Sequence, residues 1–316
     1  MTKLRQLFIL DPHESIHFDR DTSILLMDEA IRQGHSVWSC TEYEIWQRSR
    51  RKLCRARRHQ ALLTPESLRH EPEPPQLELR SFDVVHIRKD PPFDQSYVAL
   101  LLLLQDLEGP LVVNNPTALL KYNEKTTILR FPDLVTDTLV ASSLTEIESF
   151  VVDVGGQAVL KPLFSCSGRG VELLDSSEPS LRTTILSATA DQKRKVMVQR
   201  FLPQVRDGET RIFMLDDRPL GVMKKVPREG SFKANFDFGA RGVPYELNAE
   251  DRKLCDKVGT FCKGEGILLS ALDVIDGHLS EINVTSPGLL VETNEVCNRR
   301  HEGAVIELLT RRLAGT

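Results

Sequence analysis

The chain has 316 residues, of which 41% are hydrophobic, and its formal net charge at pH 7 is −4. A chain of this length can bury a large core and usually divides into two or three lobes, so it is not a small scaffold that depends on disulfides. Nucleic-acid binders are normally basic overall, and the acidic balance therefore argues against that class of partner.

Membrane and secretory roles have no support in the sequence. The longest apolar run, residues 98 to 104, is far shorter than the roughly 20 apolar residues that a spanning helix needs. The short apolar run at the N-terminus has no small-residue cleavage site behind it, so it does not resemble a signal peptide.

The cysteines form no C-x-x-C pair, which predicts reduced, mostly structural thiols in a cytoplasmic protein. Cys166 lies in a loop rich in glycine and serine, and it is the one cysteine for which the sequence leaves a role other than a structural one open.

The N-terminal pattern predicts a βαβ unit with a parallel sheet. Residues 7 to 10 and 35 to 40 have the composition of strands. Between them we expect a helix that begins with Thr22 or Ser23 as its N-cap and ends at Gly34.

A strongly basic segment, residues 48 to 58, is followed by prolines among acidic residues, including Pro72. It could be an RNA or membrane patch, but in an acidic chain a solvated excursion between two sheet strands is the favoured interpretation. Residues 82 to 87 then have the character of a buried strand. Its carboxyl end leads into charged residues from Arg88 onward, at the sheet edge where open α/β sheets place ligands.

The pattern changes at about residue 123. A strand at 111 to 113, a turn and a helix from Thr117 complete the first lobe, and a small α+β lobe with antiparallel pairing follows. Its expected elements, and those of the last third of the chain, are helices at 144 to 154, about 249 to 263 and 298 to 312, and strands at 158 to 163, 171 to 174, 196 to 201, 211 to 215 and within 268 to 284.

A hairpin in the last third carries a group of metal-binding residue types. Asp276-Gly277 between two apolar runs predicts the turn, and alternation puts Glu281 and Asn283 on one face of the second strand. Asp273 joins that face only if the loop has an odd length, for instance three residues. Such oxygen ligands suit Mg²⁺, although a half-exposed strand with polar residues facing water is the plainer alternative.

Two lysines favour an anionic ligand. Lys125 begins a helix after the lobe boundary, and Lys161 lies inside an apolar strand where an unpaired charge is costly. A phosphate is one candidate partner, and the following loop at 165 to 170 could place backbone N–H groups over it. The P-loop pattern and Gly-x-Ser-x-Gly are both absent, and Ser167 has no obvious histidine partner.

These motifs resemble the bacterial glutathione synthetases, and their order and spacing agree over nearly the whole chain except residues 41 to 80. The matching segments are RKDPPFD at 88 to 94, NEK at 123 to 125, LKPL at 160 to 163, QRFLP at 199 to 203, DGETR at 207 to 211 and LDVI with LSEINVTSP within 272 to 287.

The resemblance implies an ATP-grasp fold with three lobes, in which an N-terminal parallel α/β lobe is followed by a small central lobe and a C-terminal lobe that carries the metal site. The expected boundaries are 1 to 122, 123 to 202 and 203 to 316. The implied reaction joins γ-glutamylcysteine to glycine with ATP through an acyl phosphate. Mg²⁺, for which Mn²⁺ could substitute, would be the metal. Only small molecules would be partners, apart from copies of the chain in a homo-oligomer.

The same resemblance implies roles for matching residues. Arg211 and Lys225 would be catalytic, and Arg88, Asn283 and Ser286 would bind the peptide substrate. The metal would be held by Asp273, Glu281 and Asn283. ATP would be bound by Lys125, Lys161, Gln199, Phe201, Leu202 and Asp207.

The departures from the family concern the substrate side. Lysine stands at 225 and 233 where the family usually has arginine, and Ala240 stands where it has glycine. A lysine keeps the charge but loses the planar two-pronged grip on carboxylate or phosphate. The sequence therefore leaves two alternatives to a glutathione synthetase, namely a related ATP-grasp ligase with other substrates and a nucleotide-binding protein without ligase activity.

Overall fold

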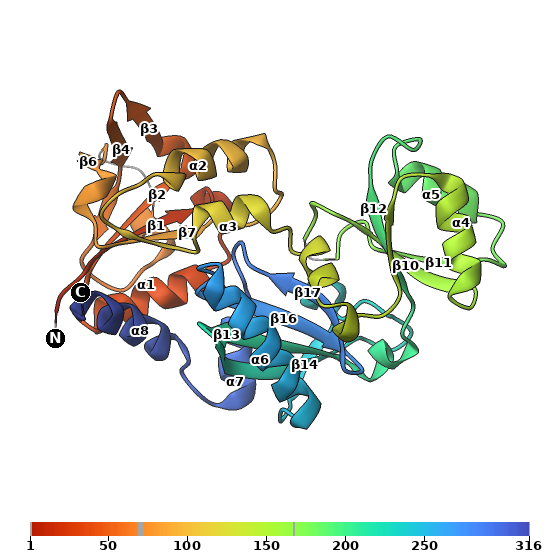
Figure 1. The fold of residues 1–316 in the computed structure, drawn as a ribbon. Coiled ribbons are helices and arrows are strands. Elements are labelled where there is room, and N and C mark those ends of the chain that lie inside the picture. Colours follow the sequence, from red (N-terminus) through yellow and green to blue (C-terminus); the bar gives the residue numbers. More distant parts are fainter. Residues whose placement is uncertain (1, 69–72, 167, 316) are drawn as a thin grey trace.

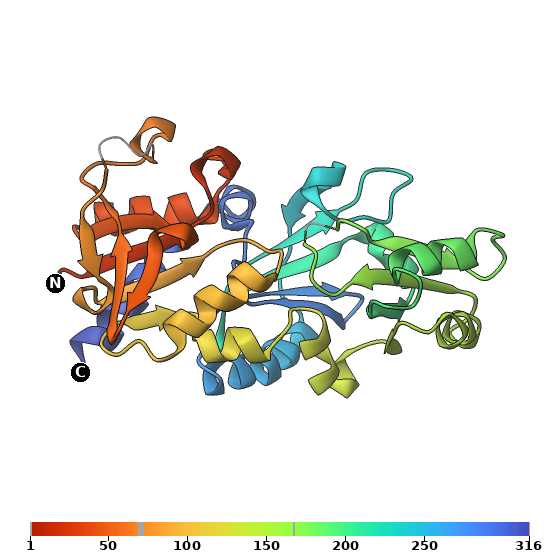
Figure 2. The same ribbon diagram turned by 90° about the horizontal axis from the view of Figure 1, so that it is seen from above.

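The computed structural model describes residues 2–68, 73–166 and 168–315. Figure 1 shows an N-terminal lobe, a smaller central lobe at the opposite end, and a C-terminal sheet between and below them. Seen from above, the same three parts follow one another along the long axis of the molecule (Figure 2). No helix in these ranges is both long and apolar enough to cross a membrane.

The N-terminal lobe is built on a five-stranded sheet of order β5-β2-β1-β7-β8. Strands β1, β2, β7 and β8 are parallel, as the predicted βαβ unit requires, and β5 pairs antiparallel to β2 at one edge. The strands are β1 (Arg5–Leu10), β2 (Ser36–Thr41), β5 (Arg57–His59), β7 (Val84–Arg88) and β8 (Leu111–Val113).

Both faces of this sheet are covered, which explains why β1 is apolar without interruption. Leu7 and Ile9 face a cluster that contains helices α2 (Gln95–Gln105) and α3 (Pro116–Lys121). Phe8 and Leu10 face the opposite cluster, with α1 (Thr22–Arg32) and the last helix, α8 (Glu302–Ala314). The C-terminal helix thus returns to the N-terminal lobe, beside α1 (Figure 1).

Two expectations for this lobe are corrected. The N-cap of α1 is Asp21, whose side chain accepts hydrogen bonds from the N–H groups of Ser23 and Ile24, so neither Thr22 nor Ser23 is the cap. The second expectation is corrected in part, because the basic segment does lie between the sheet strands β2 and β7 with most of its arginines exposed, but it forms strands and has a buried side. It contributes most of β5 and the strand β4 (Arg51–Arg55), which pairs with β3 (Ile45–Arg48) and β6 (Gln76–Glu78) in a separate sheet, and Leu53 and Cys54 of β4 are buried. Pro72 lies outside the described residues.

The central lobe is the predicted small α+β unit. Its sheet has the order β11-β10-β12-β9 and is antiparallel throughout. One face, with Leu160 and Val198, packs on the two helices; the other, with Lys161 and Gln199, is left for the interior of the molecule. The elements are β9 (Thr138–Ala141), α4 (Leu144–Asp153), β10 (Gln157–Pro162), β11 (Glu172–Asp175), α5 (Leu181–Ala188) and β12 (Val196–Arg200).

The C-terminal sheet is antiparallel, with the order β15-β14-β13-β16-β17. The sequence pattern did not predict β9, β14, β15 or α7. The elements are β13 (Glu209–Leu215), β14 (Arg218–Val226), β15 (Arg241–Pro244), α6 (Ala249–Gly264), β16 (Leu269–Ile275), β17 (His278–Asn283) and α7 (Leu290–Cys297).

Candidate active site

A large cavity lies where the three lobes meet. Its volume is about 370 Å³, within the range of small-molecule sites. The central sheet forms one wall through β10 and β12, the C-terminal sheet forms another through β13, β16 and β17, and the loop after β7 closes the N-terminal side. Every residue assigned from the resemblance except Asp207 lines this cavity.

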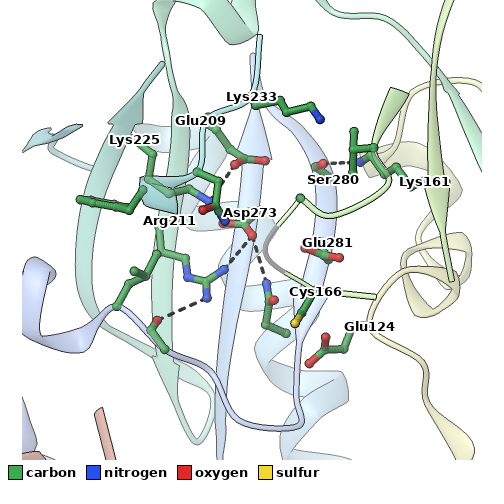
Figure 3. A pocket seen from close by; sticks show the side chains of 18 of the residues that line it. Glu124, Lys161, Cys166, Glu209, Arg211, Lys225, Lys233, Asp273, Ser280 and Glu281 are labelled. Carbon is green, nitrogen blue, oxygen red and sulfur yellow. Dashed lines mark hydrogen bonds and ion pairs between the residues drawn. The ribbon is translucent and has the colours of Figure 1, made fainter. Parts of the chain in front are cut away.

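Lys161 projects from the central sheet towards the C-terminal sheet. Its Nζ donates hydrogen bonds to Gln199 Oε1 at 2.6 Å and to Ser280 Oγ at 2.8 Å (Figure 3). Both partners are neutral, so burial lowers the pKa of Lys161, although Glu281 and Glu209 act in the opposite direction. An anion bound beside it would favour the charged form.

Lys125 lies across the same opening. It directly precedes a 3-10 helix, Thr126–Arg130, where the sequence predicted the start of a helix. Its Nζ is 2.9 Å from Glu281 Oε1 and donates to the backbone oxygen of Ser165 at 2.6 Å. The lysine thereby joins the β16–β17 hairpin to the glycine-rich loop, although Ser167 of that loop lies outside the described residues.

In the β16–β17 hairpin, Asp273 lies opposite Glu281 as predicted, but the loop length differs from the expected one. Its loop is the two-residue turn Asp276-Gly277, with Ile275 paired to His278, so the expected three-residue loop is wrong. A bulge at Ser280 supplies the odd residue instead and places Asp273 opposite Glu281. The same bulge positions the Ser280 hydroxyl that Lys161 contacts.

Asp273 is the centre of a buried charge network in Figure 3. Arg211 Nη1 donates to its Oδ2 at 2.7 Å and Lys225 Nζ donates to its Oδ1 at 2.9 Å. Lys225 is also 2.7 Å from Glu209 Oε2. Burial would raise the pKa of Asp273, but Arg211 and Lys225 outweigh it and hold that pKa below its ordinary value.

The predicted metal ligands present hard oxygen donors at one place. Asn283 donates from Nδ2 to Asp273 Oδ2 at 3.1 Å and to the backbone oxygen of Ala271 at 3.2 Å, which leaves its Oδ1 as an acceptor for a ligand. Glu281 pairs with Lys125 through Oε1 only. Among the described residues no cluster of three His, Cys, Asp or Glu side chains suited to a metal occurs, so this donor set of two carboxylates and an amide depends on Asn283. Its chemistry fits Mg²⁺.

Two of the three predicted peptide-binding residues, Arg88 and Ser286, lie at the N-terminal side of the cavity, whereas Asn283 lies on β17 beside Asp273. Arg88 is buried and donates from Nε to Ser23 Oγ at 3.1 Å and from Nη2 to the Pro287 oxygen at 3.2 Å. This contact connects β7 to the loop after β17, and Ser286 lines the cavity on that loop.

Three further residues were not given roles by sequence reasoning. Glu209 pairs with the buried Lys225, and Ser280 accepts a hydrogen bond from Lys161. Glu124 accepts hydrogen bonds from the N–H groups of Val284 and Thr285 and so fixes the loop that carries Ser286. Glu209 and Glu124 belong to the DGETR and NEK motifs, which was the available signal. Asp207, by contrast, is exposed outside the cavity.

Comparison with family models gives two matches that together span most of the chain. Residues 4–119 match the N-terminal domain of prokaryotic glutathione synthetase, and residues 124–298 match its ATP-grasp domain. The chain belongs to the prokaryotic glutathione synthetase family. It is therefore an ATP-grasp ligase, and the resemblance seen in its motifs is confirmed.

Similar proteins agree over the same span. The chain is 37% identical to a glutathione synthetase of Parasynechococcus marenigrum over 90% of this chain and 92% of that protein. It is 32% identical to one of Nitrosomonas europaea over 98% of this chain and 99% of that protein.

Solved structures of more distant proteins share the fold. The D-cycloserine synthetase DcsG has a TM-score of 0.67 at 16% identity, covering 96% of this chain and 99% of that one. The ATP-grasp ligase PsnB, in a complex that includes Mg and ADP, has a TM-score of 0.63 at 14% identity, covering 98% and 99%. These likenesses confirm the predicted ATP-grasp fold.

Proposed function

We propose that this chain joins γ-glutamylcysteine to glycine with ATP and Mg²⁺, giving glutathione, ADP and phosphate. We also propose a role in this reaction for each of the main residues around the cavity. The observation that carries the proposal is that three cations, Lys125, Arg211 and Lys225, pair with the predicted metal ligands inside one cavity, and that Lys161, whose partners are neutral, lines the same cavity. Cations gathered around one opening in this way can bind the oxygens of a phosphate chain.

The nucleotide lies between the central and C-terminal lobes. Lys125 and Lys161 hold its phosphates, and the segment from Gln199 to Leu202 holds the base; Asp207 remains a prediction for the ribose. Glu281, Asn283 and Asp273 hold the Mg²⁺. When bound, this ion neutralises the charge on the phosphate oxygens.

The peptide substrate lies at the N-terminal side, beside Arg88 and Ser286. One oxygen of the cysteine carboxylate of this dipeptide attacks the γ-phosphorus of ATP, ADP leaves, and an acyl phosphate remains. The neutral glycine amine then attacks the acyl carbon, phosphate leaves with the carbon–oxygen electron pair, and the nitrogen loses a proton, which the departing phosphate can accept. Arg211 stabilises the negative charge that develops on the phosphoryl oxygens, as positioned cations do.

Lys225 acts through its neighbours. Its Nζ contacts Glu209 and Asp273 and fixes their carboxylates, so we assign it a positioning role in place of direct contact with the phosphoryl group. We also propose that the chain self-associates, which light scattering of the purified protein would test.

The first experiment measures ADP release with γ-glutamylcysteine, with and without glycine and Mg²⁺, and detects glutathione by mass. We expect product only when all components are present. Lys161→Met is the matched inactive control, because it removes a cation at the phosphate position without changing the fold of β10. Nucleotide turnover without glutathione would reject the proposed pair of substrates.

A further inference from the structure

The loop between β14 and β15, residues 227 to 240 and here called the lid, crosses the mouth of the cavity. Six consecutive lid residues, 232 to 237, line the cavity. The lid also carries three phenylalanines, which have three different surroundings.

The cavity has two chemically distinct ends. Along β10 and β12 the residues facing the cavity alternate with those facing the helices. On β10, Val159 precedes Lys161 by two residues, and Phe201 follows Gln199 by two, so an apolar region lies directly beside the cationic one. Ile275 of β16 joins the apolar end. This arrangement suits a ligand with a flat apolar group and a phosphate chain.

Phe232 completes the apolar end from the lid side. Its ring centroid is 6.1 Å from that of Phe201, and the two rings are at 90°. Phe232 packs in one cluster with Val159, Phe201 and Ile275, yet it also lines the cavity. Part of the ring is therefore available to a ligand that enters between the sheets.

The other two lid phenylalanines pack against different segments from Phe232. A Cβ at Gly168 would lie 3.3 Å from the Phe238 ring, so Phe238 rests on the glycine-rich loop. A Cβ at Gly242 would lie 3.4 Å from Phe236, so Phe236 packs against β15. Asp237 adds an exposed ion pair with Arg20 of the N-terminal lobe, at 3.6 Å. The lid is thus fixed at several points around Phe232.

We infer that Phe232 is a base-recognition residue, whose ring contacts the purine of the ATP that the proposed function requires. The lid then senses the base as well as the phosphates. A nucleotide with a purine gains the contact with Phe232, whereas a base-free polyphosphate meets only Lys125, Lys161 and Arg211. This inference rests on the proposed use of ATP.

The test compares a ligand with a base and one without it. In the full-length enzyme, Phe232→Ala should raise the KM for ATP and the inhibition constant of ADP by about tenfold, the loss typical when an aromatic ring beside a base is removed. The inhibition constant of Mg²⁺-tripolyphosphate should stay within about twofold, since no base is present. Phe232→Tyr, which keeps the ring, should restore the ATP values.

Phe238→Ala is the matched control, because it removes a ring from the same lid but away from the apolar end. Phe238→Ala should change the inhibition constants of ADP and of Mg²⁺-tripolyphosphate by the same factor. Equal losses of ADP and tripolyphosphate binding in Phe232→Ala, or no loss of either, would overturn the inference. If the wild-type enzyme does not use ATP, the proposed function fails; if it does but Phe232→Ala binds ADP normally, only this inference fails.

Discussion

Lys225 donates a hydrogen bond from Nζ to Asp273 Oδ1 at 2.9 Å, and the side chains of both residues are almost completely buried. Arg211 occupies the other oxygen of the same carboxylate. Two cations and the two carboxylates of Asp273 and Glu209 therefore balance one another in the interior. A single ammonium group is sufficient for this position, although the family usually has arginine there.

Lys225→Met should destabilise the protein by about 3–5 kcal/mol, because it leaves buried carboxylates without a partner. Urea denaturation would measure the change. Lys224→Met is the control, since its side chain leaves the opposite face of β14 and lies over the Tyr245 ring; it should cost less than about 1 kcal/mol. Adding Glu209→Gln to Lys225→Met should recover part of the stability but not the ligase activity. An equally stable Lys225→Met protein would contradict the charge network.

Glu281→Ala should abolish ligation by weakening Mg²⁺ binding. It removes one proposed metal ligand and also the partner of Lys125. Titration of ADP release with Mg²⁺ would separate the loss of a metal ligand from the loss of the partner of Lys125. Loss of a metal ligand should raise the Mg²⁺ concentration needed for turnover by about tenfold or more. Glu295→Ala, an exposed glutamate on α7, is the control. Turnover of Glu281→Ala at the wild-type Mg²⁺ requirement would remove Glu281 from the metal site.

Cys166 should be the most reactive thiol of the native protein. It is half-buried, lines the cavity and has its Sγ 3.0 Å from Arg169 Nη2. By contrast, burial raises the pKa of Cys255 to about 12 and that of Cys262 to about 11, which keeps these thiols protonated and unreactive.

Labelling with a chromophoric disulfide should therefore show one fast thiol, which Cys166→Ser removes. Mg²⁺-ATP should slow this phase several-fold, because the nucleotide would cover the glycine-rich loop. A labelling rate that ATP does not change would place the nucleotide away from Cys166.

Asp11 should make the protein less stable as pH rises. Burial raises its pKa from 3.8 to about 6, so the folded state binds more protons than the unfolded state between these values. The free energy of unfolding contributed by this group therefore falls as pH rises through that window. Asp11→Asn keeps an oxygen for the Asp90 N–H, 2.7 Å away, and should stabilise the protein at about pH 8 by roughly 1 kcal/mol after allowance for partial exposure.

The gain in stability from Asp11→Asn should be smaller at about pH 4.5 than at about pH 8. At the lower pH the carboxyl of Asp11 is neutral in the folded state, so its buried charge no longer has to be removed, although much of this carboxyl is ionised in the unfolded state. Thermal unfolding at both pH values measures it, with exposed Asp19→Asn as the control. A gain of equal size at both pH values would show that titration of Asp11 is not its cause.

Several features followed from local sequence patterns. The βαβ opening, the antiparallel central lobe and the long helix α6 depend on periodicity and on residues that start or end elements, which act over a few positions. The motifs also identified Lys125, Lys161, Arg211 and Glu281 in advance, and these side chains share one cavity.

Other features required the tertiary structure. The Ser280 bulge, which brings Asp273 opposite Glu281, depends on how two strands pair, and a two-residue turn and a three-residue loop were both compatible with the sequence. The basic segment formed strands because Leu53 and Cys54 found a core that composition does not reveal. The position of Phe232 at the apolar end depends on contacts between segments about 30 residues or more apart in the chain. Local patterns thus determined many of the elements and the charged residues of the site, whereas the folded chain alone decided which of them meet, because long-range packing selects the register and the partners.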